Sequence, residues 1–332
     1  KIESIIPFIK IIILSGVFFS FYIIFEFSNN IFQFIPQFKF WIGEYLTLSG
    51  RSEYSEFINT DSFDILSLIR PIGFDVNFTS GAFFICSSLI FLLISGDRFT
   101  NKKRIKYFSY ILLYIALILS SSRQIVIFFH IGIFIFVISS ILNKNNVSKF
   151  LSDSIIKNFL FFIFSVSIII LIIFTSYYSL INNLIDIQNL SGTGTVGLII
   201  MDLANLYTNL EYFLINYPFN FFFGIGTYTP DYPGLYYMLP HIKELHFFTS
   251  TFYTFGLFGF IIFWGLFLKS LRKFYVVSFD SSFTKYSDLY LSILIITFIF
   301  LLCIIHYPPI GLSTNFIIAL IPYFYVKSLK LQ

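Results

Sequence analysis

The sequence predicts an all-α polytopic membrane protein with about eight transmembrane helices in a single integral membrane domain over residues 1–332. The composition is the first reason, because the chain is 57% hydrophobic and only 11% charged, whereas soluble domains carry about 25% charged residues. The second reason is that apolar runs recur along the chain between polar or charged segments, and each span needs about 20 residues. The net charge of +4 is modest, and nothing in its distribution suggests a nucleic-acid partner.

The apolar runs give the expected positions of the spans. We expect them near residues 11–27, 78–96, 107–120, 125–142, 159–178, 247–268, 288–305 and 315–327. The chain begins with Lys1 rather than methionine, and we expect further residues upstream of it, including additional helices.

Lysine and arginine orient these spans, since cytoplasmic loops of membrane proteins carry an excess of both. With the N-terminus inside, 16 of the 21 cations fall in inner segments. The exceptions on the outer face are Lys39, Arg51, Arg70, Arg123 and Lys243. Two long outer segments result, over roughly 28–77 and 179–246, and we expect any chemistry on that face.

The outer cations oppose the positive-inside bias, and an anionic ligand near the membrane would explain them. Arg123 lies in SSSRQ between two closely spaced apolar runs, and Arg70 lies in LIRPIGFDVNFTSG. Arginine suits phosphate because its planar fork binds two oxygens and stays charged. The structural alternatives are a polar turn whose arginine reaches lipid headgroups, a helix cap at Asn77, and a local ion pair for Arg51 among neighbouring acids.

Histidines and tyrosines in the outer segments are weaker candidates. His241 and His246 in HIKELH fit no zinc motif, so we expect no metal; each is an interfacial polar residue or a proton acceptor. Tyr228 and Tyr232 belong either to an interfacial aromatic belt or to a sugar-stacking surface.

Inside a span, His130 is expected to form a hydrogen bond between helices. The two cysteines, Cys86 and Cys303, fall in different apolar runs and are expected to be inert.

Four segments, taken in order, resemble the bacterial O-antigen polymerase and O-antigen ligase superfamily, most closely the Wzy-type polymerases. They are RPIGFDVNFTSGAFF, SSSRQ, YFLINYPFNFFFGIG with its Pro then Gly-x-Gly, and HFFTSTFYTFGLFGF with a histidine before Gly-x-x-Gly. Together they cover residues 70–265. In this chain Phe247 follows the histidine, where the family often has Asn or Ser, so a ligase stays an open alternative.

The resemblance implies a C-type glycosyltransferase architecture in the bacterial inner membrane, with its active site facing the periplasm. The implied substrate is an oligosaccharide on undecaprenyl diphosphate, joined to others into O-antigen or capsule without metal or other cofactor. A chain-length regulator and a flippase are possible partners. A lipid-linked glycan flippase or a non-enzymatic assembly protein is the alternative from another class.

We expect two groups of site residues on this basis. The catalytic residues would be His246, Arg123 and Arg70. The substrate-binding residues would be Arg51, Asn77, Gln124, His241, Tyr228 and Tyr232.

Overall fold

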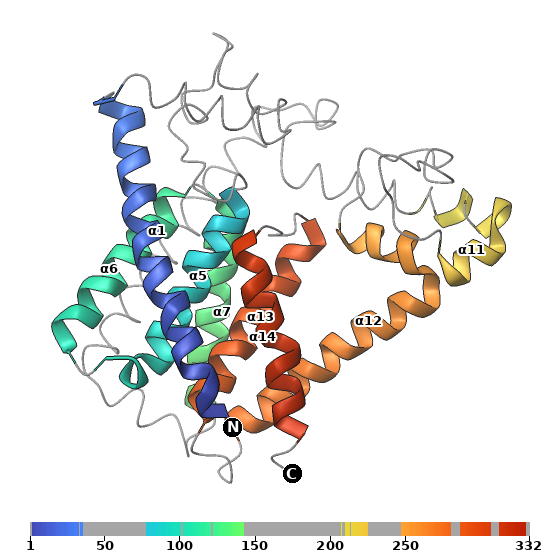
Figure 1. The fold of residues 1–332 in the computed structure, drawn as a ribbon. Helices are drawn as coiled ribbons and strands as arrows, with labels where there is room; N and C mark the ends of the chain where they lie inside the picture. The colour runs from blue at the N-terminus through green and yellow to red at the C-terminus, as the bar shows by residue number, and fades with distance from the viewer. Residues whose placement is uncertain are drawn as a thin grey trace. The chain divides into compact units, whose positions relative to one another are not determined.

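A computed structural model describes residues 2–32, 34–35, 78–100, 102–120, 122–142, 207, 210–212, 214–224, 247–279, 286–306 and 312–329. Every regular element in these ranges is helical, as the sequence predicts. The helices are η1 (Ile2–Ile5), α1 (Ile6–Phe32), α5 (Phe78–Ser95), η2 (Gly96–Arg98), α6 (Lys103–Leu119), α7 (Arg123–Leu142), α11 (Pro218–Phe223), α12 (Phe247–Phe279), α13 (Ser287–His306) and α14 (Leu312–Leu329) (Figure 1).

Helices occupy the predicted span positions wherever the structure describes them, and the predicted span at 159–178 lies outside the described residues. Three described helices are long and apolar enough to cross a membrane: Glu3–Asn29, Thr79–Arg98 and Phe255–Phe279. Three shorter apolar stretches follow the same pattern, at Ile125–Ile135, Ser287–Cys303 and Asn315–Leu329. Apolar helices of span length support membrane association, and the number of eight spans stays a prediction.

The helix that contains the predicted span at 247–268 continues beyond that span. Helix α12 ends at Phe279, and its candidate membrane stretch is Phe255–Phe279. Apolar residues resume after each cation in LKSLRKFYVVSF, and long cationic side chains can extend away from an apolar surface without ending a helix.

The described helices fall into two compact units. Unit 1 takes residues 1–146, 274–300 and 309–332, and unit 2 takes residues 147–273 and 301–308. The single membrane domain expected over 1–332 stays a prediction.

Helix α5 is the centre of unit 1, and its span is entirely buried. It packs against α1, α6, α7 and α14, and its Phe83 ring contacts the Phe300 ring of α13 with 5.8 Å between centroids. Helix α5 has apolar residues on all its faces, and neighbouring helices cover all of them. This is expected for a helix at the centre of a bundle.

Small residues let α1 approach α5 closely. A Cβ atom added at Gly16 would lie 2.3 Å from the Oγ of Ser88, so only glycine fits there. The Ser88 hydroxyl hydrogen-bonds to the Phe84 carbonyl oxygen of its own helix at 2.9 Å and lies 3.2 Å from the Ile12 carbonyl oxygen of α1. Close contacts between small residues are typical of membrane helix packing.

Candidate functional site

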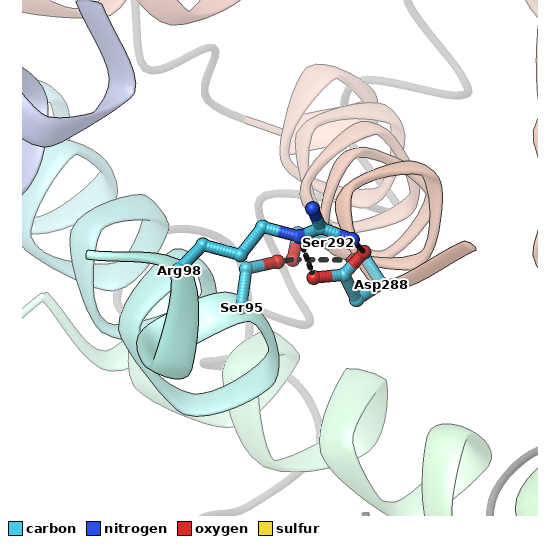
Figure 2. Close-up of polar contacts among 4 residues, drawn as sticks. All are labelled: Ser95, Arg98, Asp288 and Ser292. Atoms are coloured by element: carbon cyan, nitrogen blue, oxygen red, sulfur yellow. Dashed lines mark hydrogen bonds and ion pairs between the residues drawn. The ribbon is translucent and has the colours of Figure 1, made fainter. Parts of the chain in front are cut away.

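The two ends of unit 1 differ in their polar chemistry. At one end, η2 follows α5 and meets the start of α13 (Figure 2). Arg98 donates from Nε to Asp288 Oδ2 and from Nη2 to Asp288 Oδ1, the latter at 2.6 Å. One turn inward, the hydroxyls of Ser95 and Ser292 lie 3.1 Å apart. These contacts join α5 to α13 and leave the Arg98–Asp288 pair charge-balanced.

Further polar pairs lie at this same end of unit 1. The Tyr286 hydroxyl donates to Glu3 Oε1 at 3.0 Å, and Lys106 Nζ donates to Asp97 Oδ1 at 2.6 Å. The sequence predicts this end to be cytoplasmic, because Lys102, Lys103 and Arg104 are also there. These pairs link η1 to the residue before α13, and η2 to α6.

The opposite end of unit 1 contains the starts of α5 and α7. Helix α6 runs back along α5, because Lys106 lies beside Asp97 and the Tyr110 hydroxyl donates to the Leu92 carbonyl oxygen at 3.0 Å. After α6 ends, α7 runs back along it, and His130 Nε2 lies 3.0 Å from the Tyr114 hydroxyl. Helices α5 and α7 therefore run in the same direction and begin at the same end (Figure 1).

Arg123 and Gln124 are the first two residues of α7, and their side chains lie outside the described part. The backbone N–H of Val126 donates to the Ser122 carbonyl oxygen at 3.0 Å, which sets the start of the helix. Ser120 and Ser122 are buried on either side of the turn. Arg123 therefore begins the helix that follows the connection between α6 and α7.

The first turns of α5 and α7 contain no acidic residue, although acidic side chains stabilise the positive N-terminal end of a helix. At the other end of the unit, by contrast, Asp97 opens η2 and Asp288 opens α13. Arg123 adds a positive charge at the start of α7.

Sequence reasoning missed a carboxylate at this end. Glu26 is 1% exposed and lies near the end of α1, which runs antiparallel to α5 because Phe19 lies beside Gly81 and Ile12 beside Ser88. Ionisable residues inside apolar spans are functional candidates by default. The signal was present in the sequence, since Glu26 is the only acidic residue in the predicted span 11–27.

In unit 2, two of the motif segments meet at a pair of glycines. Gly256 interrupts α12 with φ 64° and ψ −175°, a conformation essentially restricted to glycine. A Cβ atom added there would lie 2.3 Å from the Gly224 backbone nitrogen and 2.5 Å from the Phe222 carbonyl oxygen. Gly224 itself ends α11 with φ 83°. The first glycine of Gly-x-Gly therefore contacts the first glycine of Gly-x-x-Gly.

An aromatic cluster surrounds this contact. Phe252 is buried in the part of α12 before the kink, and its ring lies 5.3 Å from the Phe221 ring of α11. Its other neighbours are Leu210, Tyr212, Tyr217, Leu257 and Phe260. The cluster fixes the Pro-containing segment onto the start of α12, whose first residue, Phe247, follows directly after His246.

The other predicted site residues lie outside the described residues. They are the predicted catalytic residues Arg70 and His246 and the predicted binding residues Arg51, Asn77, Tyr228, Tyr232 and His241. Their placement by sequence is still informative, because Asn77 directly precedes α5 and His246 directly precedes α12.

Two minor predictions were tested. His130 bonds to the Tyr114 hydroxyl across two helices, as predicted, and its Nδ1 lies 2.6 Å from the Val126 carbonyl oxygen. Cys86 and Cys303 are free, buried thiols. Within the described residues, no three His, Cys, Asp or Glu side chains are grouped so that they could hold a metal ion.

The chain matches no protein-family model, no curated protein and no solved structure. Its function is therefore argued from the residues and their arrangement.

Proposed function

We propose that this protein is a polysaccharide polymerase that joins undecaprenyl-diphosphate-linked oligosaccharide repeat units on the outer face of the bacterial inner membrane. Its product would be a surface polysaccharide such as O-antigen or capsule. We also infer a C-type glycosyltransferase architecture of about eight spans, in which the long segments 28–77 and 179–246 face outward.

The observation that carries this proposal is the arrangement of α5 and α7. Both begin at the same end of unit 1, without an acidic residue in either first turn, and α7 begins with Arg123. The partial positive charges of two helix N-termini and a guanidinium favour an anion such as a diphosphate. In the membrane, the natural ligand of that charge is a lipid-linked diphosphate, which reaches the site from the bilayer.

The contact of Gly224 with Gly256 supports the proposal from unit 2. The resemblance to the polymerases rests on four segments, and two of them pack against each other here. Sequence order alone does not require that contact, since 31 residues separate the two glycines along the chain.

The reaction would proceed as a direct glycosyl transfer. A hydroxyl oxygen of the acceptor repeat attacks the anomeric carbon of the donor sugar, and a new carbon–oxygen glycosidic bond forms. The bond between that carbon and the phosphate oxygen breaks, and undecaprenyl diphosphate leaves with the electron pair. Arg123 and Arg70 would stabilise the charge that grows on the diphosphate, and His246 would accept the hydroxyl proton.

The remaining predicted residues would bind the two substrates. Arg51, Asn77 and Gln124 would contact the donor diphosphate and its first sugar. Tyr228, Tyr232 and His241 would contact the glycan, with aromatic rings stacking on sugar faces. No metal or other cofactor is needed, because the diphosphate is already a good leaving group.

A reconstitution experiment tests the proposal. The purified full chain is placed in proteoliposomes with an undecaprenyl-diphosphate-linked repeat unit, and both glycan length and free undecaprenyl diphosphate are measured. We expect longer glycans and one undecaprenyl diphosphate released for each new glycosidic bond. Movement of the substrate across the bilayer without release of undecaprenyl diphosphate would instead show a flippase, and no change at all would support an assembly protein.

An O-antigen ligase is the closest alternative, because it would use the same donor and the same arginines. It would transfer the glycan to lipid A core rather than to a second repeat. Addition of lipid A core to the proteoliposomes distinguishes the two, since only a ligase depends on that acceptor.

A further inference from the structure

Helix α11 lies against the first turns of the candidate membrane span in α12. The rings of Phe222 and Phe223 each lie 5.6 Å from the ring of Phe258, which belongs to the span Phe255–Phe279. The backbone contact of Gly224 with Gly256 fixes this arrangement. The residues of α11 are therefore held next to a segment that is itself built to lie in a bilayer.

Exposed phenylalanine rings cover the surface where α11 meets α12. We call them the phenylalanine surface: Phe219, Phe222, Phe223, Phe255 and Phe258. Phe219 is 70% exposed, Phe223 is 59% exposed, and their rings stack with 4.7 Å between centroids. Apolar exposed residues continue along α12 as far as Leu268, at Ile261, Ile262, Leu266 and Leu268, and the exposed cations Lys269 and Arg272 follow them. The phenylalanine surface thus continues into the exposed side of the candidate span.

The polar groups of α11 are directed to its own backbone. Pro218 occupies the first turn and has no N–H group to satisfy. The Phe221 N–H donates to the Tyr217 carbonyl oxygen at 3.0 Å, and Asn220 Nδ2 donates to the Gly224 carbonyl oxygen at 3.2 Å. Lipid contact requires such internal hydrogen bonding, because acyl chains offer no partner.

Charge is absent from this part of the sequence. No Asp, Glu, Lys or Arg occurs between Glu211 and Asp231, although polar loops in water normally carry charged residues. Asn216, which directly precedes Tyr217, is exposed, and its Nδ2 donates to the Tyr212 carbonyl oxygen at 2.9 Å. Asn216 is thus an exposed polar side chain directly before the start of the aromatic segment.

We propose that α11 is a membrane anchor whose phenylalanine surface lies among the lipid acyl chains beside α12. The long segment 179–246 would then be attached to the bilayer at Pro218–Phe223 rather than projecting freely into water. Lipid is the occupant that the geometry favours, since the surface is continuous with a candidate span and the described residues that form it are all phenylalanines. This inference does not depend on the proposed polymerase activity.

Fluorescence quenching by lipid tests this anchor. Trp41 and Trp264 are replaced by phenylalanine, and a single tryptophan is introduced by Phe219→Trp or, as the matched control, by Phe221→Trp. Phe221 is on the same short helix but packs against Phe252 within the protein. Each variant of the full chain is reconstituted into vesicles that contain phospholipid brominated in its acyl chains.

The anchor predicts stronger quenching by brominated lipid for Phe219→Trp than for Phe221→Trp, and little quenching of either by aqueous iodide. Strong iodide quenching of Phe219→Trp would show that the surface faces water. Quenching by neither agent would show that protein covers it, as a second copy of the chain would do. Either result would overturn the proposal.

Cysteine reactivity gives an independent measurement should the tryptophan variants not assemble. With Cys86 and Cys303 replaced by alanine, Asn216→Cys is expected to react rapidly with a membrane-impermeant maleimide, and Phe219→Cys slowly. Dissolving the vesicles in mild detergent should not equalise the two rates, because the detergent replaces the lipid. Equal rates in intact vesicles would contradict the anchor.

Discussion

Arg123 is the residue on which the proposed chemistry depends most. It opens α7 at an end of unit 1 whose helix starts lack acidic residues. Lysine would keep the positive charge but not the planar fork that binds two phosphate oxygens. A cation at a helix N-terminus is unfavourable by itself, and the anionic ligand that we propose would offset that cost.

The variant Arg123→Lys should therefore lose most polymer formation while still inserting and folding. Removal of one such charge-directed donor lowers the rate about 10²–10³-fold, and polymer length in the reconstituted system measures it. Arg104→Lys, in the exposed first turn of α6 at the opposite end, is the matched control and should be active. Wild-type polymer lengths from Arg123→Lys would show that Arg123 does not contribute to catalysis.

The Arg98–Asp288 pair should contribute to stability and not to activity. Its side chains are 27% and 13% exposed, so removal of one charge leaves the other partly buried. We expect Asp288→Asn to lower the free energy of unfolding by about 1–3 kcal/mol, less than for a fully buried pair because water screens part of it. Thermal unfolding in detergent measures this, with the exposed Lys103→Gln as control; an unchanged midpoint would show that the pair adds nothing.

At the scale of elements, Gly256 determines how α11 packs on α12. Alanine there would require a backbone conformation that costs about 1–3 kcal/mol for other residues, and its Cβ would meet Gly224 at 2.3 Å. We expect Gly256→Ala to separate the two helices and lower thermal stability. Gly265→Ala in the same helix is the matched control, because nothing lies within 4 Å of its Cβ position.

A cross-link reports the packing directly. With the native cysteines replaced, Phe221→Cys and Phe252→Cys should be joined by a short bis-maleimide in the Gly265→Ala background. The same pair should stay unjoined when Gly256→Ala is present. Efficient cross-linking in both backgrounds would mean that Gly256 does not set the contact.

The helices were predictable from sequence, but the details of their ends and partners were not. Apolar runs of bilayer length give the positions of α1, α5, α7, α13 and α14, because the membrane fixes the length of a span. The continuation of α12 to Phe279 was missed, since cations among apolar residues do not end a helix. The Gly-x-x-Gly pattern was visible, but only the contact with Gly224 shows which glycine forms the kink.

The candidate site was predictable only in part. Sequence position was enough to predict that Arg123 lies between two helices, at the start of α7. The pairing of Arg98 with Asp288 could not be predicted, because they lie 190 positions apart in the sequence and local pattern carries no information on such contacts. Glu26 was overlooked because a single acid near the end of a long apolar run resembles an interfacial residue, whereas the structure buries it.

At the scale of the whole molecule, the account predicts opposite sides for two regions. In cells with a permeabilised outer membrane, Asn216→Cys should react with an impermeant maleimide from outside. Lys103→Cys, among the predicted cytoplasmic cations, should react only after the inner membrane is lysed. The reverse pattern would overturn the orientation that the cation distribution predicts.

The most direct test of the central claim is deletion of the gene for this chain, followed by analysis of the surface glycan on a gel. A polymerase predicts that the glycolipid of the deletion strain carries a single repeat unit, and that the wild-type gene restores long chains while the Arg123→Lys gene does not. Long glycan that still caps the glycolipid in the deletion strain would contradict the account, and free lipid-linked polymer would identify a ligase instead.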